Sequence, residues 1–160
     1  MSDSTEDFCM LELNYTPATE SNIPFIRKAY DENIASLHGV HRSDDVWQAL
    51  LADENALYYI VSASSPVAWF RLDLEDDALW LGMLQVTPVW QRKGIGRYVL
   101  SVVESIAAEK GFRKIGIHTT EDNLPARALY TSAGYLVTEI GPCTTADGVD
   151  RTGYTFLKEL

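Results

Sequence analysis

The chain has 160 residues, of which 46% are hydrophobic and 22% charged, a composition typical of one domain spanning residues 1–160. Its 23 acidic and 13 basic side chains give a net charge of −10, which disfavours a nucleic-acid partner because phosphate neutralisation needs clustered Lys and Arg. The longest apolar run, Ala78–Leu84, is far below the roughly 20 residues of a membrane-spanning helix, so no membrane partner is expected. The acidic N-terminus lacks the features of a secretory signal, which predicts a cytoplasmic protein.

Cysteine and histidine spacing gives little support for a metal site. Cys9 and Cys143 lie far apart and lack Cys-x-x-Cys spacing, so we expect two buried or inactive thiols. His38 and His41 are close in sequence, but two nitrogens without a nearby cysteine make a weak site, and we expect a loop there. No metal is therefore predicted.

Charge is distributed unevenly along the chain. Residues 1–80 hold 15 acidic and 4 basic side chains, a net of −11, whereas residues 81–160 hold 8 acidic and 9 basic side chains, a net of +1. No carboxylate occurs between Asp77 and Glu104, and this window contains Arg92, Lys93 and Arg97. We expect the window to receive an anionic ligand. For the acidic half alone, solvated surface is the simpler interpretation.

Periodicity predicts the elements of the first half in chain order. Met10–Tyr15 alternates between apolar and polar residues, as a half-buried strand does. An amphipathic helix is expected from Asn22 towards Gly39, followed by a shorter helix capped by Ser43 or Asp44. The apolar side of the shorter helix is predicted to hold Val46, Trp47, Leu50 and Leu51. An antiparallel meander of three strands should follow, at Leu57–Ser62, Val67–Leu74 and Ala78–Val86.

The second half alternates helices and strands. After Pro88, a helix with one apolar face is predicted to end at Gly111, and Phe112–Thr119 should be a strand. Asn123 can cap a further helix that ends at Gly134. The last two strands are expected at Tyr135–Ile140 and Tyr154–Leu157, with a turn at Asp147-Gly148. A strand-helix-strand unit pairs in parallel, so we predict an α/β protein with a mixed sheet and helices on both faces.

The segment Gln91–Arg97 lies between a predicted strand and the first turn of a helix. Gly94 and Gly96 would let a ligand approach free backbone N–H groups there, an arrangement suited to a pyrophosphate. The dinucleotide fingerprint Gly-x-Gly-x-x-Gly fails, because its third glycine would be Val99. The P-loop pattern also fails, because Lys93 precedes the glycines instead of following them.

Taken together, these segments make the sequence similar to the GNAT superfamily of acetyl-CoA-dependent N-acetyltransferases. The resemblance rests on the strand Leu84–Pro88, on Gln91, Gly94 and Gly96 in a Gln/Arg-x-x-Gly-x-Gly/Ala pattern, and on Asn123–Tyr135. The last segment reads Asn-x-x-Ala-x-x-Leu-Tyr-x-x-x-Gly-Tyr. The resemblance implies a GNAT-like fold in which an antiparallel meander is followed by a parallel strand-helix-strand unit.

The resemblance also implies how acetyl-CoA would be held. Leu84 and Val86 would align its pantetheine arm through main-chain hydrogen bonds, and a bulge in this strand would direct one amide at the acetyl carbonyl. Asn123 would bond the pantetheine or cap the helix that follows, and these two roles are compatible. The pyrophosphate would contact the loop residues Gln91, Arg92, Lys93, Gly94, Ile95, Gly96 and Arg97.

Two side chains are candidates for proton transfer. Tyr130 stands where family members carry a tyrosine that protonates the leaving thiolate, and the alternative is a core aromatic. His118 occupies the position at which relatives that acetylate the N-terminus of a ribosomal protein carry a glutamate proposed as the base. The alternative is a packing histidine with a water chain as the base. Strand alternation places Ile115 and Ile117 on one side and Gly116 and His118 on the other.

The sequence thus predicts an N-acetyltransferase that moves an acetyl group from acetyl-CoA directly to a primary amine in a ternary complex. The acidic half favours a cationic acceptor such as a polyamine, an amino sugar or a basic peptide end. A non-catalytic CoA-binding regulatory module is the main alternative, and the intact Tyr130 disfavours it. A nicotinamide-dependent oxidoreductase would need a third glycine and an acidic ribose partner at positions where they are missing. The resemblance leaves a homodimer open.

Overall fold

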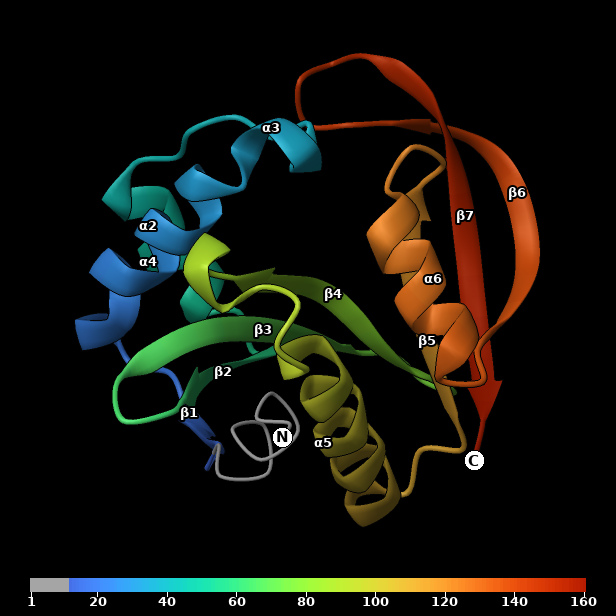
Figure 1. Ribbon diagram of the computed structural model, residues 1–160, viewed down its shortest axis with the longest axis horizontal. Coiled ribbons are helices and arrows are strands. Elements are labelled where there is room, and N and C mark those ends of the chain that lie inside the picture. Colours follow the sequence, from blue (N-terminus) through green and yellow to red (C-terminus); the bar gives the residue numbers. More distant parts are fainter. Residues whose placement is uncertain (1–11) are drawn as a thin grey trace, which may run out of the picture.

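A seven-stranded mixed sheet, with strand order β1-β2-β3-β4-β5-β7-β6, runs through the computed structural model, which describes residues 12–160 (Figure 1). The strands are β1 Asn14–Pro17, β2 Ala56–Ser62, β3 Pro66–Leu74, β4 Leu79–Val86, β5 Lys114–Thr120, β6 Leu136–Thr144 and β7 Asp150–Glu159. The helices are η1 Glu20–Asn22, α2 Ile23–Glu32, α3 Ile34–Leu37, α4 Asp44–Leu51, η2 Pro88–Trp90, α5 Ile95–Lys110 and α6 Leu124–Ser132. This arrangement confirms the predicted α/β class and the meander followed by a strand-helix-strand unit.

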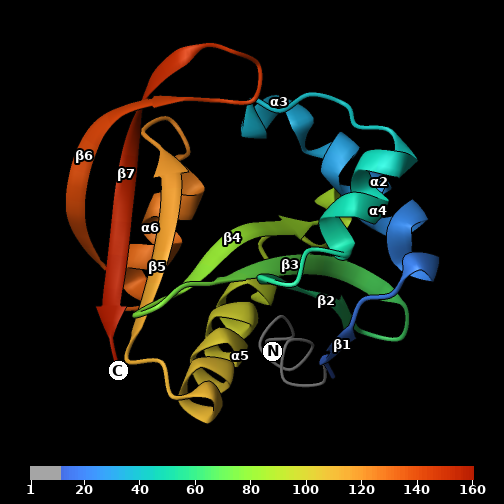
Figure 2. The same cartoon turned by 180° about the vertical axis from the view of Figure 1, so that it is seen from behind.

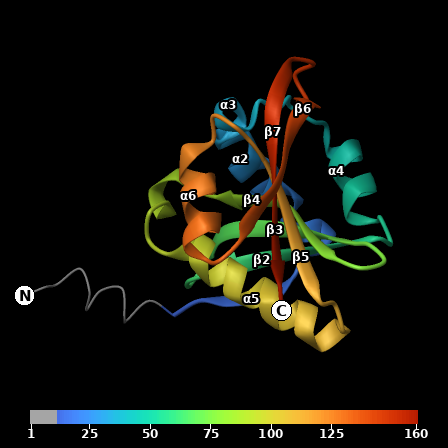
Figure 3. The ribbon, with the colours of Figure 1, turned by 90° about the vertical axis from the view of Figure 1, so that its right-hand side faces the viewer.

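Helices cover both faces of the sheet, and Figure 3 shows α6 and α4 on opposite sides of it. Strand alternation explains the two layers, because neighbouring residues on β3 enter different cores. Phe70 belongs to the core beneath α5 and α6, whereas Trp69 packs with Trp47 in the core beneath α2 and α4. Within the described residues, no helix is long and apolar enough to cross a membrane.

The parallel strands β4 and β5 pair over three residues only, and then they separate (Figures 1 and 2). The last pair joins Leu81 to Ile117. Directly after it, Gly82 is an extra residue on β4, because Leu81 pairs with Leu72 and Met83 with the preceding residue of β3. This is the bulge predicted for the strand, and bulges bend the strand that carries them.

One predicted helix is wrong in its extent. The expected continuous helix from Asn22 to Gly39 is divided into α2 and α3 at Asn33, whose φ of −104° and ψ of 6° lie outside the helical region. The Asn33 side-chain amide donates to the Gln85 side chain at 3.1 Å and to the Val86 carbonyl at 2.9 Å. These tertiary bonds to β4 outweigh helical periodicity at this residue.

Other boundaries also differ from the prediction. The predicted first strand ended before Thr16, but β1 continues through Pro17, which an edge strand tolerates. Val46, expected on the apolar side of its helix, is 43% exposed, and Ser43 is the residue that caps α4. The last two strands are longer than predicted because they form a hairpin that extends beyond the core. Cys9 lies outside the described residues.

Gly116 allows a close approach between β5 and an aromatic ring on β4. A Cβ atom at this position would lie 2.4 to 2.6 Å from three ring atoms of Trp80. We predict that Gly116→Ala lowers the free energy of unfolding by about 1 to 3 kcal/mol, because the half-buried Trp80 indole must shift. Gly141→Ala on β6 is the matched control, since no atom lies within 4 Å of its added Cβ. Equal denaturation midpoints for the two variants would contradict this account.

Candidate active site

The loop between β4 and α5 presents the open N-terminus of a helix. Gly94 precedes α5 with a φ of 86°, and no side chain caps the helix. Arg92 also adopts a left-handed conformation, with a φ of 62°. Alternating backbone conformations of this kind direct consecutive N–H groups into one concave surface, where the helix dipole favours negative charge. The structure therefore has, at the predicted place, a backbone suited to a pyrophosphate.

The residues of this loop lie in different environments. Arg92 and Lys93 are exposed, whereas Ile95 is buried in the core and can offer a ligand only its backbone. The exposed Arg97 donates to the Ser132 hydroxyl at 2.8 Å, which directs its guanidinium along α6.

Two other residues of the loop have structural contacts. Gln91 connects the loop to α2 and β4, since its side-chain amide donates to the Asn33 side chain and to the Val86 carbonyl. Gly96 lies where an added Cβ would be 2.8 Å from Leu129, so its small size serves the contact between α5 and α6.

The end of β4 directs unpaired backbone amides into the space from which β5 has separated. The Thr87 amide donates to the Val67 carbonyl on β3, so Gln85 also faces β3 by strand alternation. The backbone N–H groups of Leu84 and Val86 therefore face the opposite side, as the resemblance requires for a pantetheine arm. The Val86 carbonyl is already occupied by Asn33 and Gln91, which leaves its amide free.

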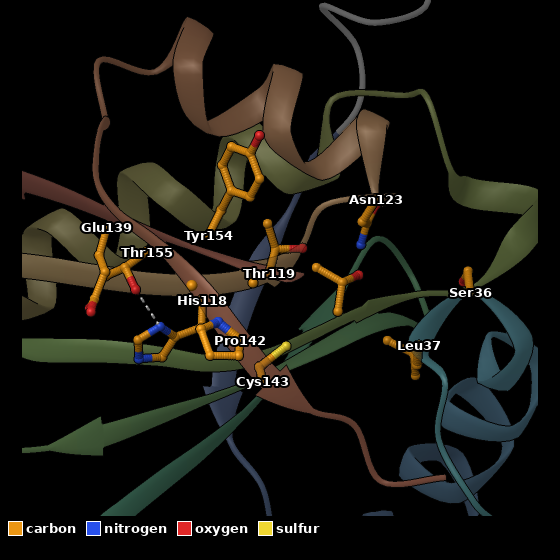
Figure 4. Close-up of a pocket in the computed structure, with 13 residues that line it drawn as sticks. Ser36, Leu37, His118, Thr119, Asn123, Glu139, Pro142, Cys143, Tyr154 and Thr155 are labelled. Carbon is orange, nitrogen blue, oxygen red and sulfur yellow. Dashed lines mark hydrogen bonds between the residues drawn. The ribbon is translucent and has the colours of Figure 1, made fainter. Parts of the chain in front are cut away.

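A cavity of about 720 Å³ lies along the last residues of β5, between α3 and the β6–β7 hairpin (Figure 4). Asn123 lines it and caps α6, because its side-chain oxygen accepts from the Ala126 amide at 3.3 Å. The cap occupies only this oxygen, so the amide nitrogen of the side chain can still donate to a ligand. Cys143, a half-buried free thiol, lines the same cavity.

Tyr130 lies on the α6 side of the sheet. It is 7% exposed and packs edge-on against Phe156 with 5.5 Å between ring centroids. Burial raises the pKa of Tyr130 to about 12, so the phenol keeps its proton at neutral pH. Its hydroxyl makes no hydrogen bond to another described residue and can donate to a ligand.

His118 lies on the other face of the sheet and is an exposed residue that lines the cavity. Its ring is stacked on Trp80 with centroids 4.6 Å apart and planes 11° apart. Its Nδ1 lies 3.0 Å from the Thr155 hydroxyl of β7 (Figure 4). The ring is thus held through one face and one nitrogen, and Nε2 is left free.

His38 joins three segments around the cavity. Its Nε2 bonds the Asp122 carboxylate at 2.7 Å, and its carbonyl accepts from the Asp147 amide in the turn of the hairpin. The Thr120 hydroxyl and the His38 ring lower the pKa of Asp122. His41 instead bonds Asp31 at 3.0 Å, so the two histidines of the weak candidate metal site have separate partners.

Sequence reasoning missed the residues that support the candidates. Asn33, Trp80 and Thr155 contact predicted site residues but lie far from them in sequence or belong to no motif. Gly116 was an available signal, because a glycine between two β-branched residues of a strand often marks the close approach of another group. No comparable signal marks Asn33 or Thr155.

Comparison with known proteins places the chain among acetyltransferases. The sequence matches the acetyltransferase (GNAT) family over residues 23–135. No curated protein matches the chain in sequence.

Solved structures of acetyltransferases share the fold. An acetyltransferase from Salmonella typhimurium that modifies the N-terminal serine of ribosomal protein L7/L12 superimposes with a TM-score of 0.81 at 15% identity, over 92% of this chain and 95% of that one. The ribosomal-protein-S18-alanine N-acetyltransferase of Escherichia coli superimposes with a TM-score of 0.76 at 18% identity, over 92% of this chain and 94% of that one. A second acetyltransferase structure from Salmonella typhimurium, which contains acetyl-CoA, superimposes with a TM-score of 0.74 at 16% identity. The match covers 92% of this chain and 94% of that one.

The loop geometry predicts that Gly94→Asp removes acetyl-CoA binding, since a side chain and a negative charge would enter the anion's place. Isothermal titration with acetyl-CoA measures the effect. Gly111→Asp is the matched control, because this glycine at the other end of α5 has a similar φ of 82° and open space around it. Both variants carry the same backbone strain, so wild-type affinity in Gly94→Asp would show that the loop does not hold the pyrophosphate.

Proposed function

The chain belongs to the GNAT family of acetyltransferases, and from this premise we propose that it acetylates a cationic primary amine by direct transfer within a ternary complex. The enzyme is an acetyl-CoA-dependent N-acetyltransferase, the activity that defines its family. The observation that carries the mechanism is the separation of β4 and β5 after Leu81 and Ile117, with one proton-transfer candidate on each face of the sheet.

Acetyl-CoA fits the donors present beside this separation. The backbone of the loop 91–97 would hold its pyrophosphate, with Arg92 and Lys93 adding positive charge. The free amides of Leu84 and Val86 would pair with the pantetheine arm. When bound, acetyl-CoA supplies the acetyl carbon that becomes bonded to the acceptor nitrogen as the bond from that carbon to sulfur breaks.

Tyr130 is our candidate for the acid. Its neutral phenol donates a proton to the sulfur as the C–S bond breaks, and it recovers a proton from the nitrogen as the amide forms. The absence of another described hydrogen-bond partner leaves this proton available for the sulfur.

His118 is our candidate for the base. An ammonium group cannot attack, so Nε2 first accepts one proton from it and later releases that proton to solvent. The Thr155 hydroxyl accepts from Nδ1–H in this scheme, which fixes the tautomer whose Nε2 is an acceptor. The acceptor amine thus approaches from the face of His118, opposite the face of Tyr130.

The acceptor is proposed to be cationic because residues 1–80 carry a net charge of −11. Such a charge raises the local concentration of cations near the site. A screen of amines with acetyl-CoA, followed by release of free thiol, tests the proposal directly. Binding of acetyl-CoA without thiol release from any amine would favour the non-catalytic module.

We predict that Tyr130→Phe lowers kcat by about 100-fold and leaves the Kd for acetyl-CoA within twofold, because only the donated proton is lost. Steady-state kinetics and calorimetry measure the two quantities. Tyr135→Phe serves as control, since it removes a buried hydroxyl without a hydrogen-bond partner from a ring 6.4 Å away. A parallel loss of binding and turnover in Tyr130→Phe would indicate a structural role instead.

For His118, the rate with limiting amine is the quantity to follow, because the imidazole is proposed to accept the proton that the ammonium group must lose before it attacks. His118→Ala should lower this rate by about 100-fold near neutral pH and recover part of it at high pH, where more amine is deprotonated. His118→Glu should retain activity. His41→Ala is a control with an exposed histidine paired elsewhere. A wild-type rate and pH profile in His118→Ala would assign the base to water.

A further inference from the structure

Three side chains form a row across the outer strands of the sheet. His118 on β5 pairs with Thr155 on β7, and Thr155 pairs with Glu139 on β6. Directly paired residues of antiparallel strands point to the same face, so all three side chains share the face of His118 (Figure 4). The row connects the candidate base to a carboxylate that belongs to no motif.

A bulge in β6 brings Glu139 to this face. Val137 pairs with Phe156, while Glu139 pairs with Thr155, so Thr138 is an extra residue on β6. If β6 paired in regular register without this bulge, alternation would place Glu139, two residues after Val137, on the face of Val137, towards α6. Bulges next to binding sites commonly redirect a side chain in this way.

The Glu139 carboxylate is free to receive a cation. No hydrogen bond or ion pair joins its side chain to another described residue, and it lines the same cavity as His118. No lysine or arginine contributes to the described lining of this cavity. The nearby Asp147 carboxylate is already paired with Arg151 at 3.0 Å. Glu139 is therefore the one fully charged side chain of the described lining, and its charge is negative.

We propose that Glu139 anchors the second ammonium group of an aliphatic diamine whose first amine is acetylated beside His118. The inference rests on the proposed function, since it assumes that the acceptor nitrogen meets the imidazole. An ammonium that enters this cavity loses part of its hydration, and a carboxylate without another partner offsets this loss. A monoamine of the same length would lack this contact.

The spacing of the row limits the distance between the two nitrogens of the acceptor. The strands that carry His118 and Glu139 lie on either side of β7. The Cα atoms of these two residues are therefore about 10 Å apart. Each nitrogen of the ligand would stand about 3 Å from its partner atom, so the two nitrogens would lie between about 4 Å apart, if both stand between the groups, and about 10 Å apart, if both stand above them. The nitrogens of extended 1,5-diaminopentane are separated by a distance in the middle of this range, about 7 Å. This diamine is therefore the probe of the subsite.

The test compares 1,5-diaminopentane with pentylamine, which differ by one ammonium group. For Glu139→Gln, the ratio of kcat/KM for the diamine to that for the monoamine should fall about three- to tenfold from the wild-type ratio. Glu159→Gln is the matched control, because it removes an exposed carboxylate from the far end of β7, outside the cavity lining. It should keep the wild-type ratio. An equal ratio in wild type and Glu139→Gln would overturn the proposal.

Binding of the diamine separates this inference from the proposed function. If neither amine is acetylated while acetyl-CoA binds, the proposed transfer to such amines fails, and the subsite is then judged by thermal shift. A rise in Tm with 1,5-diaminopentane that is lost in Glu139→Gln and kept in Glu159→Gln would support the subsite. No rise in the wild-type protein would overturn it.

Discussion

The bulge at Gly82 ends the pairing of β4 with β5, and the candidate site depends on this break. A parallel pair that continued to Val86 would bond the amides of Leu84 and Val86 within the sheet. The extra residue bends β4 away immediately after its last pair. Asn33 then holds the end of β4 to α2, so the strand stays with the first half of the chain.

The same break leaves an opening between β4 and β5 that connects the two faces of the sheet. Tyr130 belongs to the core beneath α5 and α6, whereas His118 stands on the opposite face against Trp80. In a continuous sheet, two such groups would be separated by a layer of paired backbone. Where the strands diverge, a donor group from one side and an acceptor amine from the other can meet. Under the proposed function, Tyr130 and His118 would act on the two sides of this break.

Polar contacts around the cavity connect segments that are distant in sequence. His38 reaches Asp122 before α6 and receives the Asp147 amide from the hairpin turn. Because the hairpin β6–β7 also carries Thr155 and Glu139, its attachment to α3 positions the wall of the cavity as well as its rim. The orientation of the His118 ring and the charge beside it therefore depend on elements from both halves of the chain.

Local sequence determined most of the individual elements. The glycines at the ends of α5 and α6, the Asn123 cap and the alternation of Ile115, Gly116, Ile117 and His118 are short-range features, and the structure contains all of them. The conformation of the loop 91–97 was predictable for the same reason, because it follows from Gly94 and the helix start. The roles of these residues in binding acetyl-CoA stay predictions.

The tertiary structure decided features that require a partner from elsewhere in the chain. Helical periodicity runs through Asn33 without interruption, and only its bonds to β4 divide the helix. Likewise, the face on which Glu139 stands depends on a bulge that strand alternation alone does not predict. Periodicity reports the average environment of a segment, whereas a break or a bulge depends on individual contacts made across the fold. For this reason the sequence determined which elements exist and which family they form, and the packed sheet decided which side chains meet at the site.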